Sequence, residues 1–459
     1  MRLGETFERF SQGAPISVMF RALLERTLDP GEIDRFFERT ATKQYTREIL
    51  FSSIVKLMGT VVCNTQPSVR AAYLDSLGEI AASLTAVYEK LKGIEPGVCR
   101  GFLADTAGRL RPLVLELNAT LPEPVPGYGI KILDGNHLAG TEHRIGPTRT
   151  TRAAVLPGQA LVVLEMSTML VIDVVPCEDA YTQERALVDQ VLPGVEPGDL
   201  WIEDRNFCTT RFIFGVRARG GRFLVRQHQT TLHWEEATPW VANGRVSTGS
   251  VHEQTIRAHH PETGETMKLR RIRLDLDQPT RDKETAIFLL TDLPRDSADA
   301  LLVCETYRRR WTLENVFQTL TEALNCEINT LAYPKAALFG FCVALVTYNL
   351  LAVVRAALRS EHGREEVEAK VSNYYIANEV STKYEGMMIA IPPSEWEPIQ
   401  RLSVGAMAEF LREVASQVWL AKYPRSVRGP KKPQPKKTSG RKNHHESTAR
   451  LLNKQNQQK

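Results

Sequence analysis

The pattern of apolar residues after position 127 constrains the fold of this chain more than any other feature. Short apolar segments of strand length alternate there with helical segments. We expect strands at 130–133, 160–165, 169–175, 199–204 and 222–227, and helices at 182–192 and 209–217. Strands interrupted by helices in this order are typical of a mixed sheet with helices on its faces. The sequence therefore predicts an α/β core.

The regions around this core differ from it in composition. Residues 1–121 show the spacing of apolar side chains that helices produce, and a weak helix-turn-helix signal spans 68–91. A linker rich in proline starts at 122, so we place the core at 122–228 and 285–360. It is interrupted at 229–284 by polar, turn-rich sequence that favours a β-strand insertion. Further expected regions are helical sequence at 361–422 and a basic, disordered tail at 423–459.

Charge is concentrated at the C-terminal end of the chain. Residues 421–459 contain 12 lysines and arginines and one glutamate, which leaves 46 basic and 53 acidic residues in 1–420. A basic tail of this kind is typical of an arm that binds a polyanion. A disordered segment that only keeps the protein in solution gives the same composition, and both interpretations stay open.

Two further features bear on the compartment. The seven cysteines contain no C-x-x-C pair, which favours a reducing cytoplasm over a disulfide framework or a zinc finger. Residues 336–354 carry no charge and are long enough to span a membrane. The run includes Asn349, however, and Arg355 follows it directly, so we expect a buried core helix and no contact with a membrane.

One helical window, 305–314, brings together three kinds of side chain that act on phosphates. Tyr307, Arg310 and Glu314 stand at offsets of 0, 3 and 7 within an expected helix at 296–324. At about 100° per residue they fall within an arc of roughly 60°, so a phenol, a guanidinium and a carboxylate share one face. A guanidinium suits a phosphate group.

Two aspartates end apolar runs upstream of this window. Asp134 closes the run 129–134 and Asp204 closes the run 199–204. Ligands of open α/β sheets gather at the carboxyl ends of strands. Together with Glu314 the two aspartates can form a carboxylate site for hard divalent cations. The set predicts metal-dependent phosphoryl transfer on nucleic acid.

These residues resemble the three signature regions of DDE transposases. The regions are Asp134-Gly135-Asn136, Asp204-Arg205-Asn206-Phe207 and the pattern Tyr307-x-x-Arg310-x-x-x-Glu314. The likeness is greatest to the insertion-sequence-four family of bacteria, in which a β-strand insertion also lies between the second aspartate and the glutamate. It covers roughly residues 20–360.

The resemblance implies a fold, a chemistry and partners. The core would be RNase H-like and 1–121 would bind DNA. Asp134, Asp204 and Glu314 would be catalytic and would bind two Mg²⁺ ions, which Mn²⁺ can replace. Tyr307 and Arg310 would hold DNA phosphates. The protein would cut the inverted-repeat ends of an insertion sequence through a hairpin and join them to target DNA, as a homodimer in the bacterial cytoplasm at the nucleoid.

Three other residues are candidates for DNA contact. Arg205 follows the second aspartate, and a surface arginine or a pair with Glu203 is the alternative. Trp234 or Trp240 would stack on a flipped base, as an insertion tryptophan does in that family. For each tryptophan, packing of the insertion onto the sheet is the alternative.

One position departs from the family pattern. The family's lysine, seven residues after the glutamate, corresponds to Thr321, and Lys335 is a candidate replacement. An inactive DNA-binding relative, such as an inhibitor or a domesticated remnant, therefore stays open beside an active transposase. A third alternative is a nuclease or resolvase that cuts without joining.

Overall fold

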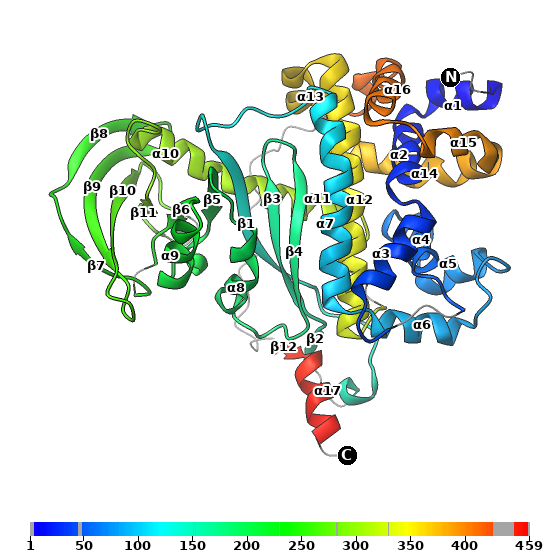
Figure 1. The fold of residues 1–459 in the computed structure, drawn as a ribbon, viewed down its shortest axis with the longest axis horizontal. Helices are drawn as coiled ribbons and strands as arrows, with labels where there is room; N and C mark the ends of the chain where they lie inside the picture. The colour runs from blue at the N-terminus through cyan, green and yellow to red at the C-terminus, as the bar shows by residue number, and fades with distance from the viewer. Residues whose placement is uncertain are drawn as a thin grey trace.

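The computed structural model describes residues 4–44, 48–149, 151, 153–228, 230–280, 283–328, 330–425 and 445–457. A ten-stranded mixed sheet extends from the left side of the molecule in Figure 1 to its middle. The strand order is β4 (Leu170–Cys177), β3 (Gln159–Glu165), β1 (Gly129–His137), β5 (Asp199–Glu203), β6 (Arg222–Arg226), β11 (Ala286–Thr291), β10 (Thr266–Leu276), β9 (Gly249–His259) and β7 (His233–Glu236), and β8 (Val241–Val246) pairs with β9.

The direction of the strands changes at β1. Strand β1 pairs in parallel with β5, and β5 in parallel with β6. On its other side β1 pairs antiparallel with β3, which pairs antiparallel with β4. Parallel neighbours end at the same edge of a sheet, so the ends of β1, β5 and β6 lie together.

Both faces of the sheet are covered by helices. On one face, α7 (Pro96–Glu116) and α12 (Pro334–His362) lie along β4 (Figure 1). On the other, an apolar cluster joins Leu133, Trp201 and Phe223 to side chains of α8 (Val188–Val191) and α9 (Thr210–Ala218). Short 3-10 turns at 184–187 and 192–194 flank α8, where the sequence predicted one helix.

The long apolar run is a core helix, as expected. Helix α12 is the one helix in the described part of the chain that is long and apolar enough to cross a membrane. Its most apolar window is completely buried inside the fold, under α7, α4 and α16 among others. Packing against several helices and a sheet edge explains why nearly every side of it is apolar.

The N-terminal and C-terminal helices pack together beyond α7 and α12 (Figure 1). Helix α2 contacts α14, α15 and α16, and one apolar core joins them to α12 and one face of the sheet. The helices are α1 (Glu5–Gly13), α2 (Pro15–Thr27), α3 (Pro30–Thr40), α4 (Phe51–Val62), α5 (Val69–Asp75), α6 (Leu84–Gly93), α13 (Arg364–Lys370), α14 (Asn373–Ala390), α15 (Pro393–Gln400) and α16 (Val404–Ser416). The division of the chain into domains stays a prediction.

The predicted fold class is confirmed: a mixed sheet flanked by helices, with helical N-terminal and C-terminal regions. The strands at 229–284 extend the central sheet through β11, which pairs with both β6 and β10. The long helix expected at 296–324 is divided into α10 (Ala300–Tyr307), a 3-10 turn at Arg308–Arg310 and α11 (Trp311–Glu322).

The C-terminal end departs from the expected disordered tail. Residues His445–Ser447 form β12, which pairs in parallel with β2 (Ala154–Leu156), and α17 (Thr448–Gln457) follows. Arg450 and Ser447 both donate hydrogen bonds to Asp179, which explains why this segment docks. The rest of the predicted tail, residues 426–444 and 458–459, lies outside the described residues.

Candidate active site

The parallel register of β1 and β5 brings the two aspartates side by side. Leu133 of β1 pairs with Glu203 of β5. Asp134 and Asp204 follow these two residues, so they lie next to each other in neighbouring segments of the chain. Asp204 directly follows β5, but Asp134 lies within β1, which continues to His137 by pairing with β3. The prediction that Asp134 ends its strand is therefore wrong by three residues, although the two side chains still meet at the end of β5.

Asp134 lies in an environment that opposes its negative charge. Burial raises the pKa of its carboxyl to about 6, and Glu184 and Asp204 add to this effect. The charge of Arg310 and the backbone N–H of Gly135 act in the opposite direction, without cancelling it. A buried carboxylate with two acidic neighbours favours a nearby cation.

The motif of α10 and α11 supplies that cation. Arg310 donates from Nη1 to Oδ2 of Asp134 at 2.9 Å and from Nη2 to Oε1 of Glu314 at 2.7 Å. Tyr307 also interacts with this guanidinium, and burial raises the pKa of its phenol well above the usual value. The 3-10 turn replaces the continuous helix that was predicted, yet the three motif side chains remain in contact.

The donor set suits a hard divalent cation, but its arrangement does not. Oxygen ligands of carboxylates are those that Mg²⁺ prefers. Among the described residues, however, no three His, Cys, Asp or Glu side chains are gathered closely enough to hold a metal ion. Asp134 and Glu314 contact opposite ends of one guanidinium instead. Their role as metal ligands, with Asp204, stays a prediction.

A fourth carboxylate at the site was not found from the sequence. Glu184 lies so close to Gly135 that a Cβ there would stand 2.0 Å from its Oε1. Asn206 donates a hydrogen bond to it at 3.2 Å. Glu184 carries no motif of its own, and only the folded chain brings the 3-10 turn at 184–187 against β1.

Arg205 lies at the rim of the site and is about half exposed. Its Nη1 stands 3.4 Å from Oε1 of Glu284. Glu284 also pairs with Arg226, at the end of β6. The alternative partner considered for Arg205, Glu203, points to the other face of the sheet. A contact between Arg205 and DNA stays a prediction.

The two insertion tryptophans surround an arginine. The guanidinium carbon of Arg271 lies 4.4 Å from the ring centre of Trp234 and 5.2 Å from that of Trp240. Phe288 contacts the same guanidinium, and Arg271 bonds to Gln227 just beyond β6. The cluster of Arg271 and its three aromatic neighbours thus lies near the sheet edge that carries the aspartates. Stacking of either tryptophan on a base is not tested by this arrangement.

Thr321 is exposed on α11. Its hydroxyl donates to the backbone oxygens of Phe317 and Gln318, each at 3.1 Å, so it points along its own helix. Lys335, the candidate replacement for the missing lysine, lies in the first turn of α12.

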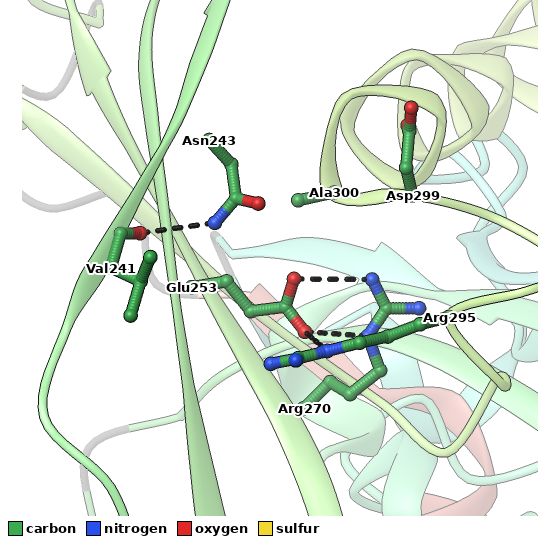
Figure 2. Close-up of a pocket in the computed structure, with 7 residues that line it drawn as sticks. All are labelled: Val241, Asn243, Glu253, Arg270, Arg295, Asp299 and Ala300. Carbon is green, nitrogen blue, oxygen red and sulfur yellow. Dashed lines mark hydrogen bonds and ion pairs between the residues drawn. The ribbon is translucent and has the colours of Figure 1, made fainter.

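The insertion anchors the start of the motif helix. Arg270 of β10 donates to Ala298 O at 2.7 Å and pairs with Glu253 of β9 at 2.8 Å. Figure 2 shows Glu253 between Arg270 and Arg295, across a small cavity from Ala300 at the start of α10. Since α10 leads directly to Tyr307, this buried ion pair helps to fix the position of the motif.

Glu203 precedes Asp204 but faces the opposite, apolar side of the sheet. It is completely buried, and neither carboxylate oxygen has a hydrogen-bond partner among the described residues. Burial raises the pKa of this glutamate well above its usual value. Folding therefore favours the protonated form of this carboxyl.

Replacing Glu203 is expected to stabilise the protein at neutral pH. Folding raises the pKa of Glu203, so the free energy of unfolding depends on pH. It is highest below about pH 4.5, where Glu203 is protonated in both the folded and the unfolded chain, and it falls as pH rises and the unfolded chain loses this proton. Glu203→Met should increase the free energy of unfolding at pH 7.5 by about 1–3 kcal/mol. Chemical unfolding at pH 4.5 and 7.5 measures this, with the exposed Glu262→Gln as control. An equal effect at both pH values would contradict it.

Comparison with known proteins points to one family. Residues 126–350, just under half of the chain, match the family model described as the transposase DDE domain. This match includes all three candidate carboxylates and supports a transposase of the DDE type. No curated protein matches the chain. The cryo-EM structure of a piggyBac transposase synaptic complex with hairpin DNA is similar at a TM-score of 0.42 and 10% identity, over 92% of this chain and 88% of that chain. That likeness is too distant to carry an argument.

Proposed function

We propose that this chain is a DNA transposase of the DDE type that cleaves DNA strands at the ends of an insertion sequence and transfers them to target DNA. The observation that carries the proposal is the meeting of Asp134 and Asp204 with the Arg310–Glu314 pair. These residues come from three distant parts of one segment, and that segment matches the transposase DDE domain.

The roles we propose follow from the chemistry of the side chains. Asp134, Asp204 and Glu314 would hold two Mg²⁺ ions, which Mn²⁺ can replace. Divalent ions at such a site activate the attacking water or hydroxyl group and stabilise the leaving oxygen. Arg310 and Tyr307 would hold the phosphate beside the cut, since a guanidinium and a phenol both donate hydrogen bonds to phosphate oxygens.

We also propose the partners and the narrower family. The chain would belong to the insertion-sequence-four family, have an RNase H-like core, and act in the bacterial cytoplasm as a homodimer on inverted-repeat ends. The sheet order β4-β3-β1-β5-β6, in which β3 alone runs antiparallel to the other four strands, supports the core assignment. Trp234 and Trp240 remain candidates for contact with the cleaved end.

A strand-cleavage and joining assay tests this function. The full chain is incubated with Mg²⁺, supercoiled target plasmid and labelled DNA from the flanks of its own gene. We expect 3′-hydroxyl ends at the inverted repeat and labelled plasmid. Cleavage without joining would favour a nuclease or resolvase.

The second candidate function is an inactive DNA-binding relative. The neutral, exposed Thr321 at the position of the family's lysine favours it. A gel-mobility assay on the same labelled DNA separates the two functions. A shifted band there, together with intact DNA in the cleavage assay, would support this alternative and contradict the transposase.

A further inference from the structure

Arg310 lies between Asp134 and Glu314, two of the three carboxylates of the proposed site. Only 13% of its side chain is exposed, and its two terminal nitrogens contact Asp134 and Glu314. Glu314 is 51% exposed, so it has room to change its position, whereas Asp134 is fixed by β1. One positive charge therefore faces two negative ones.

The contacts of Arg310 leave part of its hydrogen-bonding capacity unused. Its Nε is buried and has no partner within the described part of the chain. Guanidinium groups bind phosphates through two parallel hydrogen bonds, commonly from a fork of two nitrogens. A phosphate that engages Nε and Nη2 together would satisfy Nε and would compete with Glu314 for Nη2.

The geometry points to Arg310 as a substitute cation that blocks divalent-ion binding until a DNA phosphate engages it. Without DNA, the guanidinium binds both Asp134 and Glu314, and Glu314 stays apart from the two aspartates. When a phosphate draws the guanidinium away, Glu314 is released toward Asp134 and Asp204. Divalent-ion binding and DNA binding therefore favour each other. This inference rests on the proposed function and adds an order of events to it.

Direct binding of Mn²⁺ to the full chain without DNA tests the inference. Isothermal titration calorimetry compares the wild type with Arg310→Met and Arg310→Gln, which keep much of the side chain and remove its charge. We expect both variants to bind Mn²⁺ at least about 10-fold more tightly than the wild type, as coupling between two sites commonly gives. The neighbouring Arg309→Met, on an exposed side chain, should bind Mn²⁺ as the wild type does.

Two further measurements make the result decisive. Thermal unfolding shows whether each variant is folded, and Asp204→Asn combined with Arg310→Met should lose the gain, because the ion would then lack a ligand. Unchanged or weaker Mn²⁺ binding by both folded Arg310 variants would overturn the inference. If the wild type still cleaves DNA in that case, only the blocking role of Arg310 fails; absence of cleavage would instead count against the proposed function.

Discussion

Replacing Asp204 with asparagine is expected to reduce DNA strand cleavage about 1000-fold or more. Asparagine keeps the size of the side chain and its place beside Asp134 but removes a negative charge from the proposed metal site. Metal ions at such sites contribute several kcal/mol to the stabilisation of the transition state, and about 4 kcal/mol corresponds to 1000-fold in rate. Initial rates of 3′-hydroxyl formation on labelled end DNA measure the effect.

The control for this experiment is Glu322→Gln. Glu322 is an exposed acid on the same helix as Glu314, two turns farther on, and contacts Gln318. We expect its cleavage rate to stay within a few-fold of the wild type. Asp204→Asn should still shift end DNA in a gel-mobility assay, since it adds no repulsion to phosphates. Cleavage near the wild-type rate by Asp204→Asn would remove Asp204 from the catalytic set.

The sequence predicted the central part of this site because local patterns determine it. Apolar runs of strand length ended near Asp134 and Asp204, and parallel strands of one sheet end at one edge. The register of β1 and β5 then makes their adjacency a consequence of strand pairing. The spacing of Tyr307, Arg310 and Glu314 likewise predicted a shared face, and these residues touch despite the 3-10 turn.

Other features depend on contacts between distant segments, which a local pattern does not contain. Strand β1 extends past Asp134 because β3 supplies hydrogen-bond partners as far as His137. Glu184 reaches the site only through the turn that packs on β1. The bridge from Arg310 to Asp134 joins residues 176 positions apart. Residues 445–457 dock on the core through the hydrogen bonds of Ser447 and Arg450 to Asp179, which a basic composition alone does not reveal.

The polar residue within the apolar run of α12 has an equally non-local role. Asn349 is completely buried. Its Oδ1 accepts from the N–H of Val171 and its Nδ2 donates to the oxygen of Val171, each at 2.8 Å. Val171 belongs to β4, the strand at the end of the sheet, where one row of backbone groups has no neighbouring strand. The amide of Asn349 therefore takes the place of a strand partner.

Replacing Asn349 with leucine is expected to destabilise the protein by at least about 2 kcal/mol, because the N–H and C=O of Val171 would remain buried without partners and each such group costs about 1–3 kcal/mol. Differential scanning calorimetry should show a melting temperature lower by about 2 °C or more, since the unfolding entropy of a chain of this length is about 1 kcal/mol/K. The control is Thr347→Val, since the hydroxyl of Thr347 donates to Val343 O of its own helix and interacts with the Cys63 thiol, and neither contact involves the edge of β4. We expect that variant to melt within about 1 °C of the wild type. Equal melting temperatures for Asn349→Leu and the wild type would show that the edge of β4 does not depend on this amide.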